Sequence, residues 1–433
     1  MAAGKLFMKQ PCKLIRASLL GLWLLILPAL AVADEQLAYV SQILEEGNHQ
    51  MVRGMHAQER TILRATAALK SDQPVQALEL LASAKKQDPL VALLQAEAHR
   101  IQAVDAMKQA GAYGEDSGAQ EQLLASADLG LGEANARLYS FMDKLNQDAG
   151  DPVDILLPGT NIANIFMIDK ARSRMFLYAS DGKGGLVKLA DEYVVTGSEK
   201  GDKQVQGDGK TPNGIYRFIS KLHGDKLDSR YGPFAFPIDY PNELDALHKK
   251  NGNGIWLHGY PLDVLRRPPQ DTRGCFSISN NRLVALADHV KLKRSWVIVG
   301  ENFAFNQRDK KHELLASVRN DIETWRRDWA SLNSTSYLSH YHENFRSGER
   351  DLAAWKHYKR GVNANKSFID VAFANLSVMH DPNRWPEGEV VVAEFDQHYR
   401  SSNYADQGRK RLYLARYSET QPWKILLEES VKP

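Results

Sequence analysis

The sequence predicts a chain of several domains: an α-helical N-terminal part, a mainly-β central part and an α+β C-terminal part. Length is the first observation, because 433 residues correspond to about three domains. The second is a change of hydrophobic spacing near Gly150, from the three- and four-residue spacing of helices to β-rich runs. The third is the order after residue 318, where helical patterns precede strand-like ones, as in α+β domains.

Composition and charge narrow the classes of function. Hydrophobic residues make up 43% of the chain and charged residues 25%, which is ordinary for globular proteins. The formal net charge of +2 gives no reason to expect nucleic acid as a partner. No His, Cys or carboxylate cluster has the spacing of a metal site, and we expect neither a metal nor a cofactor.

Residues 1–33 have the pattern of a secretory signal peptide. A basic leader precedes the apolar run 19–33, which ends in the small-residue motif Ala31-Val32-Ala33. The alternative is an uncleaved anchor, but the run is shorter than the roughly 20 residues of a bilayer span, and Pro28 interrupts it. We therefore expect an exported protein of the periplasm or cell wall.

Residues 34–150 are predicted to form a helical domain. Alanine and leucine recur at helical spacing, and the turn signal Gln87-Asp88-Pro89 separates two such runs. This pattern indicates helical hairpins. They serve either as a surface for a homodimer or a protein partner, or only as a packing domain.

Residues 155–302 are predicted to form the mainly-β domain. The runs 165–168 and 175–178 are joined by a polar turn and predict a hairpin. Further strands are expected at 193–196, 214–219, 255–257 and 295–299, with one helix over 283–291.

Residues 303–317 are charged and predict a linker or a lead-in helix before a domain at 318–433. That domain is expected to begin with a helix carrying Ile322, Trp325 and Trp329 on one face, followed by a short helix over 337–345. Four strand-like runs follow, at 369–373, 390–399, 412–417 and 423–427.

Cysteine usage directs attention to one thiol. The chain has two cysteines, Cys12 and Cys275. Cys12 lies in the leader, so cleavage would leave Cys275 without an internal disulfide partner, and it is then either reactive or simply buried. His258 follows a predicted strand upstream, and sixteen residues lie between it and Cys275. A nearby imidazole and a helix N-terminus both favour the nucleophilic thiolate.

The neighbours of this pair suit acyl transfer. Gly274 permits close approach of the backbone to a substrate, and N–H groups around Cys275 are candidate donors to an oxyanion. Gly259 is the candidate to orient His258 through its carbonyl group. On spacing alone, a core histidine and a core cysteine are equally good interpretations.

The surrounding motifs favour the catalytic interpretation. Residues 164–299 resemble the L,D-transpeptidase (YkuD-type) catalytic domain, which has a β-sandwich-like fold. The most specific match is the ordered run 207–216, GDGKTPNGIY, and His258-Gly259 and Gly274-Cys275 match the catalytic motif. The resemblance implies that Cys275 is the nucleophile and His258 its base, acting on peptidoglycan stem peptides.

One position departs from the family pattern. Thr272 fits, but Arg273 stands where a second histidine is usual. Arg273 is either a bidentate ligand for a substrate carboxylate or a solvated charge. Thr272 and Tyr260 are weaker candidates for contact with substrate.

The C-terminal part resembles the cone-shaped nuclear-transport-factor-2-like (NTF2-like) module found behind some L,D-transpeptidase domains. Its aromatic residues either line a pocket or, more commonly, form a core. The domain order also resembles the cell-shape-determining L,D-carboxypeptidases. The resemblance of the catalytic domain implies a transpeptidase that passes the acyl group to an acceptor amine. The alternatives are a carboxypeptidase that trims tetrapeptides to tripeptides with water, and a non-catalytic wall-binding scaffold.

Overall fold

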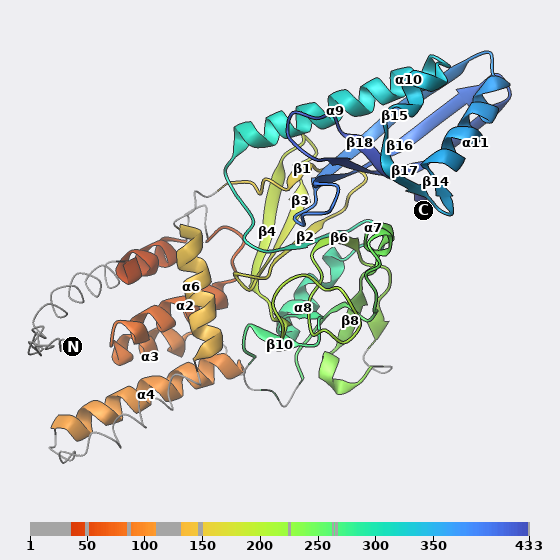
Figure 1. The fold of residues 1–433 in the computed structure, drawn as a ribbon. Coiled ribbons are helices and arrows are strands. Elements are labelled where there is room, and N and C mark those ends of the chain that lie inside the picture. The colour runs from red at the N-terminus through yellow and green to blue at the C-terminus, as the bar shows by residue number, and fades with distance from the viewer. Residues whose placement is uncertain are drawn as a thin grey trace, which may run out of the picture.

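The computed structural model describes residues 36–47, 52–84, 88–109, 131–145, 150–223, 227–261, 264 and 267–431. Figure 1 shows three parts in sequence order: helices near the N-terminus, a β-rich centre, and a C-terminal sheet with long helices. The predicted multidomain organisation and the character of each part are confirmed. The predicted signal peptide, residues 1–33, lies outside the described residues.

The helical domain consists of residues 36–46 and four further described helices, which are α2 (Ala57–Lys70), α3 (Pro74–Ala82), α4 (Pro89–Gln109) and α6 (Gly132–Leu145). Of the predicted turn before α4, Gln87 lies outside the described residues; Pro89 is the first residue of the helix, and the Asp88 carboxylate accepts from the Leu90 N–H at 2.9 Å. Two apolar clusters fill the domain. No helix of the described residues is long and apolar enough to cross a membrane.

The central domain contains two main sheets. One has the strand order β4-β3-β2-β12-β6, with bounds β2 (Ile165–Asp169), β3 (Arg174–Ser180), β4 (Leu186–Tyr193), β6 (Gly214–Arg217) and β12 (Trp296–Gly300). The other has the order β11-β9-β8-β7, with bounds β7 (Leu222–His223), β8 (Phe234–Pro237), β9 (Trp256–His258) and β11 (Phe276–Ser277). A parallel pair, β5 (Thr196–Gly197) and β10 (Gln270–Thr272), and the helices α7 (Glu243–Leu247) and α8 (Asn280–Leu286) complete it.

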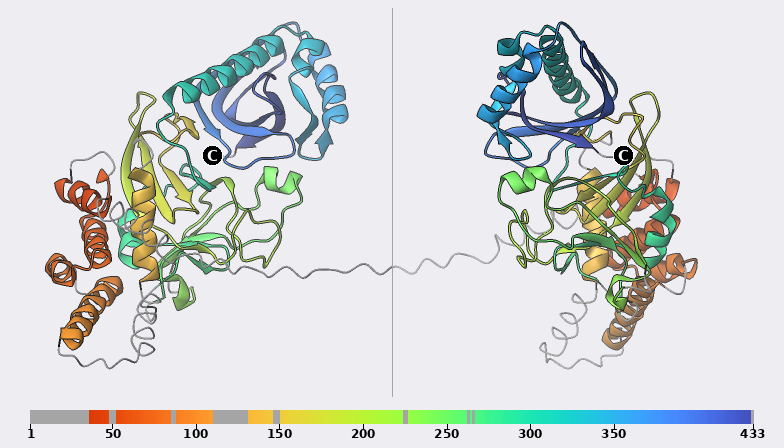
Figure 2. Two further views of the ribbon diagram at one scale, coloured as in Figure 1. Left: turned by 60° about the vertical axis from the view of Figure 1, so that its left-hand side comes forward. Right: turned by 90° about the vertical axis from the view of Figure 1, so that its right-hand side faces the viewer.

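The C-terminal domain wraps a curved sheet around long helices (Figure 2). Its helices are α9 (Arg308–Ala330), α10 (Ser334–Leu338) and α11 (Leu352–Ala364). Its strands are β13 (Tyr341–Ser347), β14 (Arg350–Asp351), β15 (Ile369–His380), β16 (Glu389–Ser401), β17 (Tyr404–Arg416) and β18 (Lys424–Val431).

The structure corrects three boundaries expected from the sequence. The charged segment 303–317 is mostly the first part of α9, so the lead-in helix is confirmed and the linker is not, and the helix begins at Arg308 rather than near residue 318. The helix expected over 337–345 is wrong, because α10 ends at Leu338 and the following residues form β13. The short strand β1 (Ile155–Leu157) was assigned to the central domain, but it pairs with β15 of the C-terminal sheet. Such edges depend on long-range pairing, which local patterns do not encode.

Side-chain alternation joins the domains into stacked layers. On β2, Phe166 and Ile168 face the core between the two central sheets, whereas Ile165 and Met167 face the C-terminal domain. Alternate residues of β16 and β17 meet them from the other side, including Val392. Because residues point alternately to opposite faces of a strand, both faces of the five-stranded sheet are buried. The four-stranded sheet that carries His258 therefore packs against a sheet that is buried on both faces.

Candidate active site

The predicted base ends one strand of the four-stranded sheet, and the predicted nucleophile directly precedes the neighbouring strand. β9 ends at His258 and pairs in parallel with β11, with Ser277 opposite His258. Cys275 lies two residues before Ser277. Because paired residues share a face and residues two apart on a strand point the same way, this register puts the thiol and the imidazole on one side of the sheet.

One hydrogen bond determines how His258 is protonated. Its Nδ1 atom lies 2.6 Å from the carbonyl oxygen of Gly259, and a carbonyl oxygen can only accept. Nδ1 therefore carries the proton, and Nε2 of the neutral ring keeps its lone pair. The edge of the imidazole also meets Tyr231, with ring centroids 5.0 Å apart. The arrangement leaves Nε2 able to accept a proton.

Cys275 follows a tight turn held by Thr272. The Thr272 hydroxyl donates to the Cys275 carbonyl at 2.6 Å and accepts from the Gly274 N–H at 3.1 Å. Gly274 has φ +122°, and a Cβ atom there would lie 2.7 Å from the carbonyl oxygen of Lys210, so the turn requires glycine. The Gly274 amide is thus already engaged, and the oxyanion role predicted for it requires that this bond be shared. Thr272 is buried, and its contact with substrate stays a prediction.

Burial holds both reacting groups in their neutral forms. It lowers the pKa of His258 to about 4, and the charge of Arg267 acts in the same direction. It raises the pKa of Cys275 to about 11, although a backbone hydrogen bond from Trp256 and the charges of Lys203 and Arg267 oppose that rise. At neutral pH the pair is therefore a thiol and an imidazole, not an ion pair.

The sequence-based expectation of a thiolate stabilised at a helix N-terminus is wrong for this state. The next helix, α8, begins only at Asn280, and helix-dipole effects fall off within a turn. The Cys275 Sγ atom instead donates to the Gly254 carbonyl at 3.2 Å. That hydrogen bond stabilises the protonated thiol.

The GDGKTP segment braces the Cys275 turn. The Thr211 hydroxyl accepts from the Gly197 N–H at 2.8 Å and lies 3.4 Å from the Cys275 carbonyl oxygen. Asp208 organises the loop: although burial acts to raise its pKa, hydrogen bonds from the Lys203 ammonium and from backbone N–H groups lower it to about 2. The motif is thus a support for the nucleophile.

The two remaining predicted residues, Arg273 and Tyr260, differ in their exposure to solvent. Arg273 is exposed, directly before Gly274, and has no hydrogen-bond or ion-pair partner in the described part of the chain. Tyr260 is half-buried and held by Asn280, whose side chain bonds both its N–H (2.8 Å) and its carbonyl (2.9 Å). Contact of either residue with substrate stays a prediction.

Two residues of the site, Ser277 and Tyr231, were given no individual role by the sequence. Arg267 was noted only as part of the loop 261–271, which either shapes the acceptor side or is an inert surface loop. Ser277 donates to the Gly259 carbonyl at 2.9 Å, Tyr231 contacts the His258 ring, and Arg267 carries charge close to both reacting groups. All three residues lie within 164–299, the part of the chain that resembles the family, and this was the one available signal. The contacts of Arg267 with both halves of the site follow from the tertiary structure.

The comparisons with known proteins agree with this geometry. Residues 163–299 match the family described as the L,D-transpeptidase catalytic domain, and residues 317–429 match the Cds6 C-terminal NTF2-like domain. The solved structure of the helical cell shape determining protein Pgp2 from Campylobacter jejuni is 31% identical, with a TM-score of 0.55, and the match covers 65% of this chain and 96% of that one. The chain belongs to the L,D-transpeptidase family.

Two further solved structures are similar to this L,D-transpeptidase. A mutant of Pgp2 is 31% identical, with a TM-score of 0.56 and coverage of 65% of this chain and 94% of that one. Bd1075 from Bdellovibrio bacteriovorus shares the fold, with 24% identity, a TM-score of 0.57 and coverage of 65% and 98%. No curated protein sequence gave a match. Family membership makes this chain an enzyme of peptidoglycan metabolism, and neither family match reaches the helical domain.

The aromatic residues of the NTF2-like domain are core rather than pocket lining. Trp325, Trp329, Tyr337 and Phe345 are all at most 5% exposed and pack in one cluster. Ile322, Trp325 and Trp329 share the buried face of α9 as predicted, whereas Phe345 reaches the cluster from β13.

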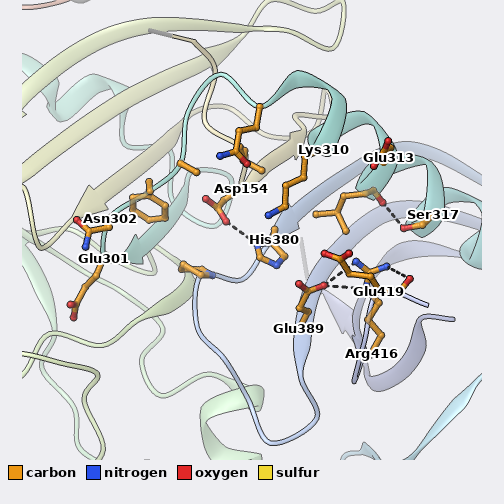
Figure 3. Close-up of a pocket in the computed structure, with 16 residues that line it drawn as sticks. Asp154, Glu301, Asn302, Lys310, Glu313, Ser317, His380, Glu389, Arg416 and Glu419 are labelled. Carbon is orange, nitrogen blue, oxygen red and sulfur yellow. Dashed lines mark hydrogen bonds and ion pairs between the residues drawn. The ribbon is translucent and has the colours of Figure 1, made fainter. Parts of the chain in front are cut away.

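A cavity of about 450 Å³ lies where the NTF2-like domain meets the catalytic domain (Figure 3). Its charged side chains are partly paired, with His380 bound to Asp154 at 2.8 Å and Arg416 to Glu389 at 2.9 Å. None of the predicted site residues lines it. Among the described residues, no group of three or more His, Cys, Asp or Glu side chains is placed to hold a metal ion.

Proposed function

We propose that this L,D-transpeptidase-family enzyme cleaves the bond before the terminal D-alanine of peptidoglycan stem tetrapeptides through a Cys275 acyl-enzyme. The observation that carries the proposal is the hydrogen bond from His258 Nδ1 to the Gly259 carbonyl. It presents Nε2 of a neutral imidazole on the face of the sheet from which the thiol projects.

The first step follows from the protonation states. The Cys275 sulfur attacks the carbonyl carbon of the third residue while the thiol proton passes to His258 Nε2. The C–N bond then breaks, and the same proton goes to the leaving amine of D-alanine. This leaves a thioester and a neutral imidazole. Because the resting pair is neutral, proton transfer accompanies attack rather than preceding it.

For the second step, we propose that water resolves the thioester, which makes the chain an L,D-carboxypeptidase. His258 takes a proton from water as the water oxygen bonds to the acyl carbon, the C–S bond breaks, and the departing sulfur takes that proton from His258. The support is the likeness to a cell shape determining protein, which spans both the catalytic and the NTF2-like domains. An acceptor amine in place of water would make it a transpeptidase, the outcome that the catalytic-domain resemblance alone implies.

One assay separates these outcomes. Purified protein is incubated with tetrapeptide muropeptides, and the products are separated by chromatography and identified by mass. Tripeptides and free D-alanine support hydrolysis, whereas crosslinked dimers support transfer. Cys275→Ala should give neither product. His258→Gln, which keeps the size but loses the base, should fall at least about a hundredfold in kcat.

The scaffold alternative is tested by covalent labelling. A carbapenem should add one acyl group to the wild-type chain and none to Cys275→Ala, as read by intact mass. An unlabelled wild-type protein that also leaves tetrapeptides intact would rule out the enzymatic proposal. The export predicted from residues 1–33 is a separate proposal, tested by N-terminal sequencing of the cell-associated protein.

A further inference from the structure

A buried ionic network fastens the helical domain to the catalytic domain. Arg137 of α6 pairs with both Glu59 of α2 and Glu133 of α6. Glu59 in turn pairs with Arg174 of β3 at 2.7 Å, and Arg174 with Asp191 of β4 at 2.6 Å. All five side chains are at most 10% exposed. Breaking one partner of such a network is costly, so the two domains act as one unit.

The network reaches a backbone segment that leads to the nucleophile. Glu133 uses its second carboxylate oxygen to accept the backbone N–H of Arg267 at 3.1 Å. The backbone carbonyl of Arg267 accepts from the Tyr193 hydroxyl at 2.9 Å. Arg137 lies over the Tyr193 ring, 4.3 Å from its centre. The backbone of Arg267 is therefore held from both sides, once by the helical domain and once by β4.

The Arg267 side chain links the two halves of the active site. Its guanidinium pairs with the Asp271 carboxylate at 3.0 Å and lies 5.5 Å from the centre of the Tyr260 ring. Asp271 adjoins Thr272, which holds the Cys275 turn. Tyr260 directly follows Gly259, the acceptor for His258. Arg267 is 7% exposed, and its charge lowers the pKa of both reacting groups.

We propose that the helical domain is part of the catalytic unit: Glu133 is a positioning residue that holds Arg267, and Arg267 holds the Cys275 turn relative to the His258 strand. The catalytic part of this inference rests on the proposed function. It goes beyond the family comparisons, because neither family match includes the helical domain. Glu133 and Arg137 also wall a cavity of about 470 Å³ whose other side is formed by Tyr260 and Asn280. The helical domain thus closes over the flank of the site.

Glu133→Gln is the sharpest test. The amide oxygen can replace the carboxylate toward Arg137, but the NH₂ group then faces the Arg267 N–H, donor against donor. Glu97→Gln is the matched control, because Glu97 lies in the same domain and, within the part of the chain that the structure describes, pairs only with the neighbouring Arg100. Tyr193→Phe is a second variant, which removes the hydroxyl that anchors the Arg267 carbonyl and keeps the ring beneath Arg137.

Two readouts do not depend on the substrate. Hydrogen exchange of residues 267–272 should be at least about tenfold faster in Glu133→Gln than in wild type or Glu97→Gln. Alkylation of Cys275 by iodoacetamide at pH 8 should be about threefold slower, because the pKa of the thiol rises when the Arg267 charge moves away. Tyr193→Phe should change the exchange rate and the alkylation rate in the same directions. A variant with both substitutions, Glu133→Gln and Tyr193→Phe, should change each rate by less than the sum of the two single effects on a free-energy scale.

Turnover of tetrapeptides should fall about tenfold in kcat with little change in KM, because positioning rather than binding is lost. Unchanged exchange at 267–272, or unchanged or faster alkylation, would overturn the inference. If wild-type protein leaves tetrapeptides intact, the proposed function fails, and exchange and alkylation still decide whether Glu133 positions the site.

Discussion

Ser277 and His258 share one hydrogen-bond acceptor, the carbonyl oxygen of Gly259. Ser277 Oγ donates to it at 2.9 Å and His258 Nδ1 at 2.6 Å. The two residues are register partners on β11 and β9, so the strand that follows the nucleophile also steadies the group that orients the base. Nucleophile and base are thereby positioned by a common element.

Ser277→Ala should reduce kcat about tenfold and leave KM nearly unchanged. The Gly259 carbonyl loses one of its two donors, a buried hydrogen bond worth about 1 kcal/mol, and the imidazole is less well oriented. Steady-state kinetics on tetrapeptides measures the effect. Ser279→Ala is the control, because the Ser279 side chain makes no capping hydrogen bond to α8. Equal losses in both variants would contradict the orienting role.

The acid limb of the pH profile should lie near pH 4. The pKa of His258 is lowered from its ordinary value to about 4 by burial, so the neutral base persists well below pH 6.5. Activity should be retained at pH 5 and fall about tenfold per unit below pH 4. The measurement is kcat/KM against pH, with circular dichroism to confirm that the protein stays folded. A limb at pH 6.5 would show that the ring is solvated during turnover.

Gly274→Ala should destabilise the protein by about 1–3 kcal/mol and slow acylation of Cys275. Its φ of +122° disfavours a side chain, and the new Cβ atom would lie 2.7 Å from the Lys210 carbonyl oxygen. Gly182→Ala separates the two causes, because Gly182 has φ +74° but open space around it. Denaturant unfolding of both variants measures the difference. A smaller loss for Gly274→Ala than for Gly182→Ala would contradict the steric account.

Stability should fall in acid partly through Asp208. Its pKa is lowered to about 2 in the folded state, below the ordinary aspartate value, so its stabilisation is present above about pH 4 and is lost as pH falls toward 2. The linked free energy is roughly 2 kcal/mol. Asp208→Asn should lose stability at pH 7 and show a flatter dependence between pH 4 and 2. A wild-type slope in the variant would assign the acid sensitivity to other carboxylates.

Much of the organisation was predictable because it depends on local pattern. Helical spacing before Gly150, alternating strands after Ile162 and the motif around His258 and Cys275 are all short-range signals. Boundaries that depend on partners far away were predicted less well. β1 belongs to the C-terminal sheet because it pairs with β15, more than 200 residues later. Nothing near residue 155 encodes that pairing.

The residues and their order were enough to identify the groups that can react: a single candidate thiol beyond the leader, a histidine at a strand end, and a glycine before the nucleophile. The protonation and orientation of those groups could be known only from the folded molecule. Burial makes the thiol and the imidazole neutral, and the Gly259 carbonyl selects the tautomer of His258. Contacts between distant segments bring Glu133 of the helical domain to Arg267. Protonation and orientation depend on the surrounding dielectric and on hydrogen-bond partners, and both are properties of the packed molecule.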